Sequence, residues 1–453
     1  MQEIIDKISS FVWGPPTLIL IVGTGLYLTF RLGFLQFRTL PYALRLAFSP
    51  RKQDKKSKGD ITHFQALSTA LAATVGTGNI VGVATAVVLG GPGAVFWMWI
   101  TALVGMATKY AEAILAVKYR VTNSKGEMSG GPMYYLEKGL KQKWLAVLFA
   151  LFGAIAAFGI GNMVQSNAVS SALSESFGVS TWVTGIILTV LTGIVIIGGI
   201  KSIGKVTAFF VPIMALFYLI AGLIIIVMNF DLVPQTINLI FTDAFTAQAV
   251  GGGLLGTVIR YGVARGVFSN EAGLGSAPIA AAAAKTDYPG RQALVSMTQV
   301  FIDTIVVCSI TGITIVMAGL YGPEADSGAL TAASFSAFLG STGGYLVTIA
   351  TVLFAYSTLI GWSYYGEKCF SYLINDKAIP YYRVVFVLAV GYGAVESLNI
   401  VWAIADIMNA LMAIPNLIGL LGLSGVVVYE TKKFLAVAKE EREQEKRAKS
   451  KSA

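Results

Sequence analysis

The stretch ATVGTGN, Ala73–Asn79, decides the fold, because it interrupts an apolar segment that is otherwise long enough to cross a membrane. That segment covers residues 61–89. Glycine costs a helix about 1 kcal/mol relative to alanine, and Gly76 and Gly78 flank Thr77 here. The pattern therefore predicts a helix that breaks halfway across the membrane. Non-helical backbone at that depth persists only where it is buried in protein or lines a wet cavity, so we interpret the break as part of a binding site.

The composition places the whole chain in a membrane. Of its 453 residues, 55% are hydrophobic and 13% are charged, and the mean hydropathy is +0.71. Apolar runs of spanning length recur from end to end, which indicates a polytopic helical membrane protein; a β-barrel would show short alternating segments instead. The first residues, MQEIIDKISSF, lack the features of a removable signal peptide.

The residue types also limit the chemistry. The net charge of +9 does not predict nucleic-acid binding, because the basic residues fall in loops on one side and in the tail. His63 is the single histidine, so catalysis or a metal site based on histidine is not expected. Cys308 and Cys369 are expected to be buried free thiols rather than a disulfide.

Eleven apolar segments are expected to span the membrane, and residues 34–48, which mix aromatic and arginine residues, are expected to lie in the interface. The expected spans are 12–30, 61–89, 93–118, 144–174, 180–199, 204–229, 250–283, 290–320, 342–374, 380–395 and 400–430.

The distribution of lysine and arginine predicts the orientation. Every second connection and the tail after Glu430 are basic, whereas the alternate connections carry acidic residues and essentially no basic ones. With eleven spans, the N-terminus lies outside the cell and the C-terminus lies in the cytoplasm. Arg260 and Arg265 do not fit this count, and we expect them to face water or to pair with an acidic residue.

A second interruption, SNEAGLGSAP at Ser269–Pro278, breaks the seventh span with two glycines and a proline. The two broken spans lie five spans apart, and this odd number inserts the second group of five upside down. Interrupted helices at matching positions of inverted repeats indicate a secondary transporter. The expected divisions are residues 1–60 for an extra helix, an interfacial helix and a basic loop, 61–229 for the first repeat, 246–430 for the second, and 431–453 for a charged tail.

A broken helix offers charge-binding groups without any charged side chain. The amides that open its second half lie at the positive end of a helix dipole, and the carbonyls that end its first half lie at the negative end of the other. Here the amides of Thr77 and Gly78 suit a carboxylate. The carbonyls of Ala72, Thr74 and Val75 suit a hard cation, as do the side-chain oxygens of Thr74 and Asn79. Two kinks without a ligand are the alternative, and a phosphate-binding glycine loop lacks its lysine.

Other polar groups in the spans are candidates for function, because ionisable groups at this depth are costly. The alternative for each is a buried group that only joins helices, and for Ser357 and Thr358 a hydrogen bond within their own helix. Phe268 and Trp362 are packing residues or gates. The polar groups are Glu112, Gln165, Asn167, Glu271, Asp303, Asp406 and Asn409.

Two longer strings carry a family resemblance. GGPGAVFWMWITALVG, Gly90–Gly105, and RGVFSNEAGLGSAP, Arg265–Pro278, resemble the signatures of the alanine or glycine:cation symporter (AGCS) family, which includes sodium:alanine symporters. The resemblance covers essentially the whole chain. It implies an all-α LeuT-type fold of five plus five inverted helices with one extra N-terminal helix. It also implies uptake of small neutral amino acids, chiefly alanine and glycine, with sodium or sometimes protons.

The first break is similar to the first helix of the leucine transporter, which has a glycine–any–glycine–asparagine run. This likeness implies two sodium sites, one with Thr74 and Asn79 and one that joins carbonyls of the break to hydroxyls of the ninth span. The candidate substrate contacts are Thr77, Gly78, Asn79, Gln165, Phe268, Ser269, Asn270, Gly273 and Trp362. The candidate sodium ligands are Ala72, Thr74, Val75, Asn79, Asp303, Ser357 and Thr358.

The expected function is therefore sodium-coupled symport of alanine and glycine across the plasma membrane, with no resident cofactor and no obligatory protein partner. Phe268, Trp362 and Gln165 are expected to crowd the pocket and to exclude leucine. Proton coupling remains an alternative, and a channel is disfavoured because the polar groups cluster at one depth. A membrane enzyme is disfavoured because no nucleophile with a base and an orienting group is visible.

Overall fold

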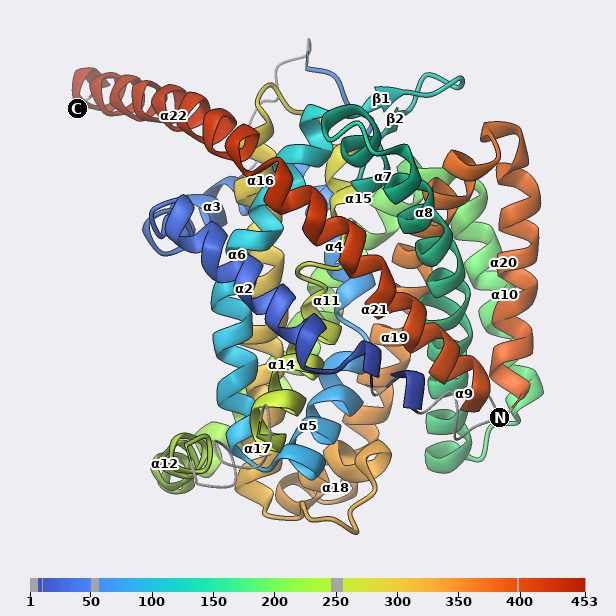
Figure 1. Ribbon diagram of the computed structural model, residues 1–453. Helices are drawn as coiled ribbons and strands as arrows, with labels where there is room; N and C mark the ends of the chain where they lie inside the picture. Colours follow the sequence, from blue (N-terminus) through green and yellow to red (C-terminus); the bar gives the residue numbers. More distant parts are fainter. Residues whose placement is uncertain (1–6, 10, 50–56, 246–255, 397–398, 453) are drawn as a thin grey trace.

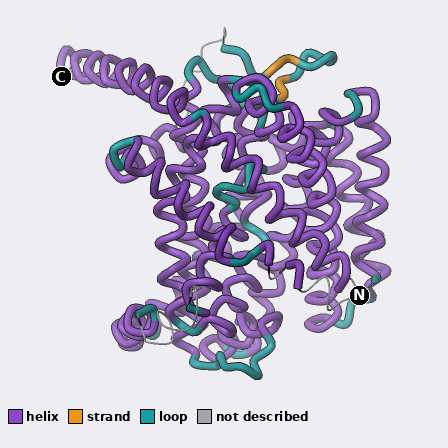
Figure 2. Tube along the Cα trace, viewed as in Figure 1, coloured by secondary structure: helices purple, strands orange, loops and turns teal. Residues whose placement is uncertain are grey.

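The computed structural model consists of long helices and one small hairpin (Figures 1 and 2). It describes residues 7–452 except 10, 50–56, 246–255 and 397–398. The basic residues at 51–56 and the expected start of the seventh span at 250 lie outside the described residues.

The first apolar segment is broken where the glycines predict it. Helix α4 covers His63–Thr74 and begins with a capping box, in which Thr62 and Gln65 bond each other's backbone amides. The chain leaves the helix at Val75 (φ −76°, ψ 91°) and resumes as a π-turn at Gly78–Gly82 (η1) and helix α5 at Val83–Gly90. The two halves are bent by 55°. The predicted break is confirmed.

The second break is also confirmed, and it is longer. Helix α14 (Thr257–Asn270) ends at Glu271, whose φ of +57° is left-handed. Gly273 and Gly275 follow with φ of +93° and +85°, which side-chain-bearing residues rarely adopt. The second half is a helix of only five residues, α15 (Pro278–Ala282).

The remaining helices surround these two broken segments. Helix α2 (Pro15–Arg31) is followed by α3 (Leu35–Phe48) at 84°, as expected for a span followed by a helix in the interface. The others are α6 (Gly93–Lys118), α7 (Pro132–Tyr134), η2 (Tyr135–Gly139), α8 (Lys143–Phe158), η3 (Gly159–Met163), α9 (Val164–Phe177), α10 (Thr181–Ile197), α11 (Gly199–Met228), η4 (Phe230–Leu232), α12 (Val233–Asp243), α16 (Pro289–Val300), η5 (Phe301–Cys308), α17 (Ser309–Ala318), α18 (Ser327–Leu339), α19 (Ser341–Leu373), η6 (Asp376–Ala378), α20 (Ile379–Val395), α21 (Asn399–Gly422) and α22 (Ser424–Ser452).

By length and apolar composition, seven helices in the described residues can span a membrane, or up to nine if each bent pair is one span. The expected count of eleven stays a prediction, since α10 and the broken α14–α15 segment fall below that length. Helices α12 and α18 were not expected. The last span ends at Gly422 rather than near residue 430, and α22 continues through the tail.

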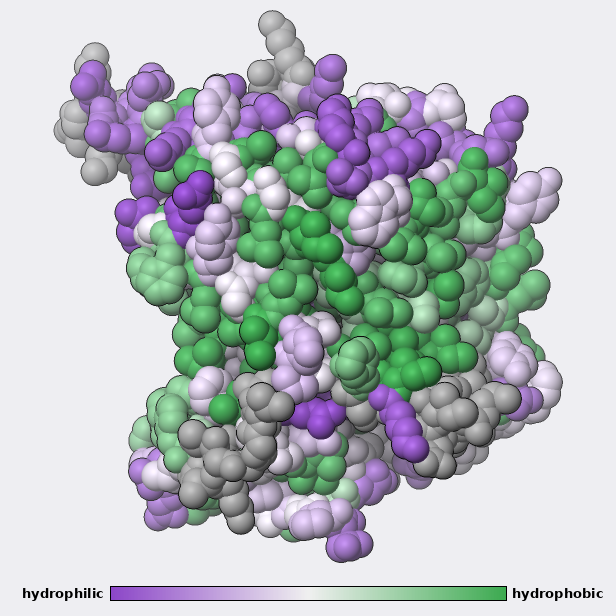
Figure 3. Space-filling model, viewed as in Figure 1, coloured by the Kyte–Doolittle hydropathy of each residue, from purple (hydrophilic) through white to green (hydrophobic). Residues whose placement is uncertain are grey.

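The surface supports a membrane location. Figure 3 shows a broad hydrophobic band across the middle, with hydrophilic residues gathered at the end that carries α22 and the hairpin of β1 (Val121–Thr122) and β2 (Met128–Ser129). On α10, Ile186 and Ile194 are 62% and 66% exposed. Such exposure suits lipid contact but would be costly in water.

Helix α19 positions the first break by close packing. A Cβ built on Gly361 would lie 2.7 Å from the backbone nitrogen of Ala73, so only glycine allows α19 to approach α4 at this point. This approach places the preceding turn of α19, which carries Ser357 and Thr358, against the carbonyl groups that end α4.

Candidate functional site

The two breaks face each other in the interior. A Cβ built on Gly78 would lie 3.3 Å from Cα of Ser269 and 3.4 Å from the ring of Phe268. The amino end of the η1–α5 segment therefore lies against the carboxyl end of α14. A partial positive and a partial negative helix terminus meet at one place, which suits a ligand that carries both a carboxylate and an ammonium group.

Asp303, on the π-helix η5, joins the two breaks. Its carboxylate accepts hydrogen bonds from Asn79 Nδ2 (2.8 Å) and Ser269 Oγ (2.8 Å). Thr304 Oγ1 adds a third at 2.8 Å, and Asp303 is fully buried. Cys308 lies in the same cluster, 3.3 Å from Asn79 Nδ2. Both cysteines are free and buried, as expected.

Four oxygens gather where α4 ends, and these are the four that the resemblance implies for one sodium site. Ser357 Oγ lies 3.1 Å from the Ala72 carbonyl oxygen and 3.3 Å from that of Val75. Thr358 Oγ1 lies 3.2 Å from the Ala72 carbonyl oxygen. All four residues are buried. Carbonyl and hydroxyl oxygens at an unwound helix end are the donor set that transporters use for sodium.

The ligands expected for the other sodium site are not all brought together. The hydroxyl of Thr74 donates to the Ala70 carbonyl of its own helix at 3.0 Å, and the described residues show no hydrogen bond from it to Asn79 or Asp303. Asn79 Oδ1 accepts the Gly76 amide at 2.9 Å, which stabilises the turn of the break.

Gln165 reaches the first break from the η3–α9 segment. Its Nε2 bonds Thr77 Oγ1 at 3.2 Å and the Ile160 carbonyl at 2.9 Å. Its Oε1 is buried and has no hydrogen-bond partner among the described residues. A Cβ on Gly76 would lie 3.5 Å from this oxygen. A buried acceptor without a partner is costly unless a ligand donates to it.

The amides of the second break are held by α6 and α21. Glu112 Oε1 accepts from the amides of Gly273 (3.0 Å) and Gly275 (3.1 Å) and from Asn416 Nδ2 (2.7 Å). Lys109 compensates the charge of Glu112 at 3.7 Å and donates to the Glu271 carbonyl at 2.9 Å. The backbone of Gly273 is therefore bonded to Glu112 of α6 and Asn416 of α21, and its expected contact with the substrate stays a prediction.

Trp362 and Asn270 also bind the second break to its surroundings. Trp362 Nε1 donates to Glu271 Oε1 at 2.9 Å, and its side chain packs against Gly161. Asn270 Nδ2 donates to Thr304 Oγ1 at 3.1 Å. Among the expected substrate residues, Thr77, Gly78, Gln165, Phe268 and Ser269 surround the facing helix ends.

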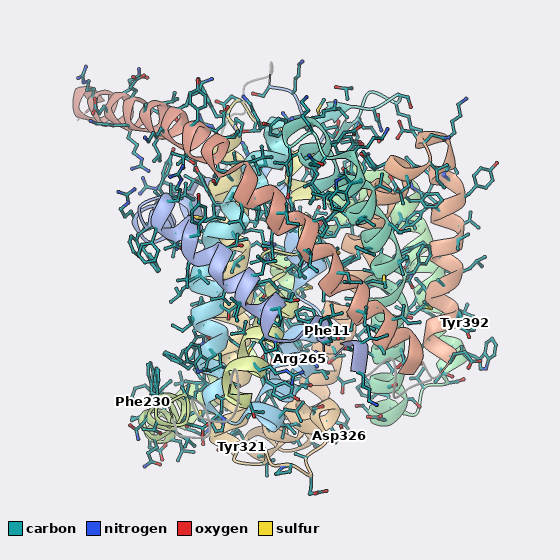
Figure 4. All side chains as sticks on the ribbon, viewed as in Figure 1. Phe11, Phe230, Arg265, Tyr321, Asp326 and Tyr392 are labelled. Carbon is teal, nitrogen blue, oxygen red and sulfur yellow. The ribbon has the colours of Figure 1, made fainter. Side chains whose placement is uncertain are left out.

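A surface pocket of about 200 Å³ has Phe268 among its lining residues. It is lined by Arg260, Arg265 and Asp406, so both arginines that did not fit the span count lie beside an acid and an opening, as expected. The guanidinium of Arg265 stacks over Phe268 at 5.6 Å. Arg265 is labelled in Figure 4, away from the hairpin end of the molecule.

Several residues of these networks were not predicted from the sequence. Lys109, Asn416, Thr304 and Ser276 were not singled out, although the first is an ionisable residue inside an apolar span. Ser276 Oγ donates to Glu271 at 2.5 Å. A rule that treats every charge within a span as functional would have found Lys109.

Paired helix breaks in an apolar bundle define a membrane transporter of the LeuT type. The crystal structure of MhsT in complex with L-phenylalanine matches with a TM-score of 0.61 over 83% of this chain and 93% of that one, at 14% identity, which shows the fold alone. The model of the sodium:alanine symporter family matches residues 1–449, so the chain belongs to that family.

Relatives agree with this assignment over more than nine tenths of their length. The sodium/alanine symporter AgcS of Methanococcus maripaludis is 61% identical over 97% of this chain and 98% of its own. The probable sodium/glutamine symporter GlnT of Bacillus subtilis is 39% identical over 96% and 91%. The family consists of symporters, so the expectation of a sodium-coupled transporter rather than an enzyme is confirmed.

Proposed function

We propose that this chain carries alanine and glycine into the cell together with sodium, by alternating access. The observation that supports this most directly is the contact between Gly78 and Ser269, which sets the positive end of one helix against the negative end of another. The amides of Thr77 and Gly78 receive the substrate carboxylate. The carboxyl end of α14 receives the ammonium group, and the Oε1 atom of Gln165 is a further acceptor for it.

Sodium binds between the Ala72 and Val75 carbonyls and the hydroxyls of Ser357 and Thr358. The two hydroxyl oxygens lie 3.1 and 3.2 Å from the Ala72 carbonyl oxygen, close enough for one ion to bind all three. The ion then joins α19 to the end of α4, next to the amides that bind the substrate. Because both ligands use the same stretch of backbone, each strengthens the binding of the other.

The orientation follows from the charges. The hairpin and α22, at the hydrophilic end of Figure 3, face the cytoplasm. Tyr321 and Asp326, labelled at the far end in Figure 4, then face the outside. The same charge rule puts the N-terminus outside as well. The pocket beside Arg265 is then the outer approach to Phe268.

The substrate site beside the Thr77 and Gly78 amides admits small side chains only. Phe268 is in contact with Gly78, and Gln165 bonds Thr77, so both border the space beside the binding amides. Trp362 packs on Gly161, in the η3 turn that precedes Gln165. Overlap with a larger side chain is a severe penalty, whereas the methyl group that glycine lacks contributes only about 1–3 kcal/mol. We expect alanine and glycine to be taken up and leucine to be rejected; uptake of leucine at the rate of alanine would contradict this.

The experiment is uptake of isotope-labelled alanine into liposomes that contain the purified protein. We expect accumulation against a gradient that needs external sodium and is lost when lithium or choline replaces it. Uptake driven equally well by a proton gradient without sodium would favour the alternative of proton coupling. Uptake that never exceeds equilibrium under any ion gradient would favour a channel and refute the proposal.

A further inference from the structure

The two broken segments meet a second time, at the end of the molecule that carries the hairpin. The extended stretch before α4, Lys58–Ile61, runs beside the stretch that begins at the last residue of α15, Ala282–Lys285. The Ala283 carbonyl accepts from the amides of Asp60 (2.8 Å) and Ile61 (3.2 Å), and the Lys285 amide donates to Ile61 at 2.7 Å. Ile61 and Ala284 form a parallel bridge.

This approach of two backbones requires a glycine. Gly59 has φ of +149°, and a Cβ built on it would lie 2.3 Å from the Lys285 nitrogen. Neither stretch is an extension of a sheet, since the described residues contain a single two-stranded sheet elsewhere. The bridge is therefore stabilised by its own few backbone hydrogen bonds and by side chains that bond to the two stretches.

One guanidinium holds both stretches. Arg120, between α6 and β1, donates from Nη1 to the carbonyls of Ala282 (2.9 Å) and Ala284 (2.7 Å). Its Nη2 donates to the Lys58 carbonyl at 2.8 Å. Three acceptors from two chain segments suit the planar fork of arginine, whereas a lysine ammonium is a point charge that cannot span them.

We propose that Arg120 is the latch of a cytoplasmic gate, which keeps the inner ends of the two broken helices joined while the site faces outward. The β1–β2 hairpin anchors the latch. The Met128 amide donates to Asp60 Oδ2 at 2.7 Å, and Glu127 pairs with Lys368 of α19 at 3.5 Å. A shift of α19 relative to α4 is therefore transmitted to the same point.

Release of substrate to the cytoplasm requires that these two helix ends separate, and that Arg120 releases either the Lys58 carbonyl on one side or the Ala282 and Ala284 carbonyls on the other. This inference rests on the proposed function and its orientation, since only an inner gate must close while sodium and substrate enter from outside. Arg120 acts here as a positioning residue, because it contacts neither ligand. Gly59 and the Asp60 carboxylate complete the closed arrangement from the α4 side.

The test is hydrogen–deuterium exchange, followed by mass spectrometry, on the full chain in detergent with saturating sodium. In Arg120→Ala, we expect at least about tenfold faster exchange in peptides that cover residues 58–62 and 282–286, because three charge-assisted hydrogen bonds are lost. Exchange elsewhere should stay as in the wild type. Lys125→Ala is the matched control, since Lys125 is an exposed residue of the same hairpin with the same charge.

Two outcomes overturn the proposal: wild-type protection of both segments in Arg120→Ala, or faster exchange spread evenly over the whole chain. If that variant does not fold, Arg120→Lys replaces it, and the same two segments must exchange faster than in the wild type. In liposomes, Arg120→Ala should raise the external sodium concentration for half-maximal uptake, because fewer molecules face outward. Failure of wild-type transport would refute the proposed function and leave the exchange result to decide on the latch.

Discussion

Replacement of Thr358 by valine removes one oxygen from the proposed sodium site and little else. The two side chains have the same shape, so the packing of α19 is retained. Thr358 Oγ1 lies 3.2 Å from the Ala72 carbonyl and 3.1 Å from that of Phe354, and the residue is 2% exposed. The ion loses one of its four protein oxygens, and either the Ala72 or the Phe354 carbonyl loses a hydrogen-bond donor.

The size of the effect follows from the charge on the ion. A contact between a polar group and a charged one contributes about 1.5–3 kcal/mol, and 1.4 kcal/mol corresponds to a tenfold change in affinity. We therefore expect sodium to bind about 10- to 100-fold more weakly. By linkage, the affinity for alanine at low sodium should fall, and it should recover when sodium is raised.

The assay is alanine uptake into proteoliposomes as a function of external sodium, with sodium binding to detergent-purified protein as a second measurement. Thr351→Val is the matched control, because Thr351 lies on the same helix and, among the described residues, its hydroxyl bonds only the Val347 carbonyl, at 2.9 Å. An unchanged sodium dependence in Thr358→Val, or an equal change in the control, would refute the placement of the ion.

Two further variants test the rest of the site. Asn79→Ala removes the bonds to the Gly76 amide and to Asp303, so binding of both sodium and alanine to purified protein should weaken; unchanged binding would show that the site lies elsewhere. Glu112→Ala leaves two amides and Lys109 without their buried partner, and the loss of one member of a buried pair costs about 3–5 kcal/mol. We expect a lower thermal unfolding midpoint or loss of folded protein, and wild-type stability would contradict the role given to Glu112.

The sequence predicted the two breaks because their cause is local. Glycines at 76 and 78, and glycines and a proline between 273 and 278, oppose helix whatever surrounds them. The lipid environment removes the other options for the backbone, so the interruption had to be buried against protein. The carbonyls of Ala72 and Val75 followed from the break itself. Their grouping with Ser357 and Thr358 came from resemblance, since no spacing rule connects residues 72 and 358.

Partners from distant parts of the chain could not be predicted in this way. Glu112 and Asn416 meet at the second break from two helices, and no local pattern pairs them. Thr74 as a sodium ligand stays a prediction, and its hydroxyl bonds the Ala70 carbonyl of its own helix, as threonine in a helix often does. Helices α12 and α18 were missed because connecting segments of this length were read as loops.

The two broken segments touch at two levels, and this arrangement bears on coupling. At the centre, Asp303 joins Asn79 to Ser269. At the hairpin end, the backbone bridge of Ile61 and Ala284 joins the same two segments again. Each segment bends at its break, so a tilt of one inner half relative to the other must disturb the bridge, the central cluster, or both. A cation that fixes α19 to the end of α4 removes part of that freedom, and it therefore favours the state in which the inner ends are joined.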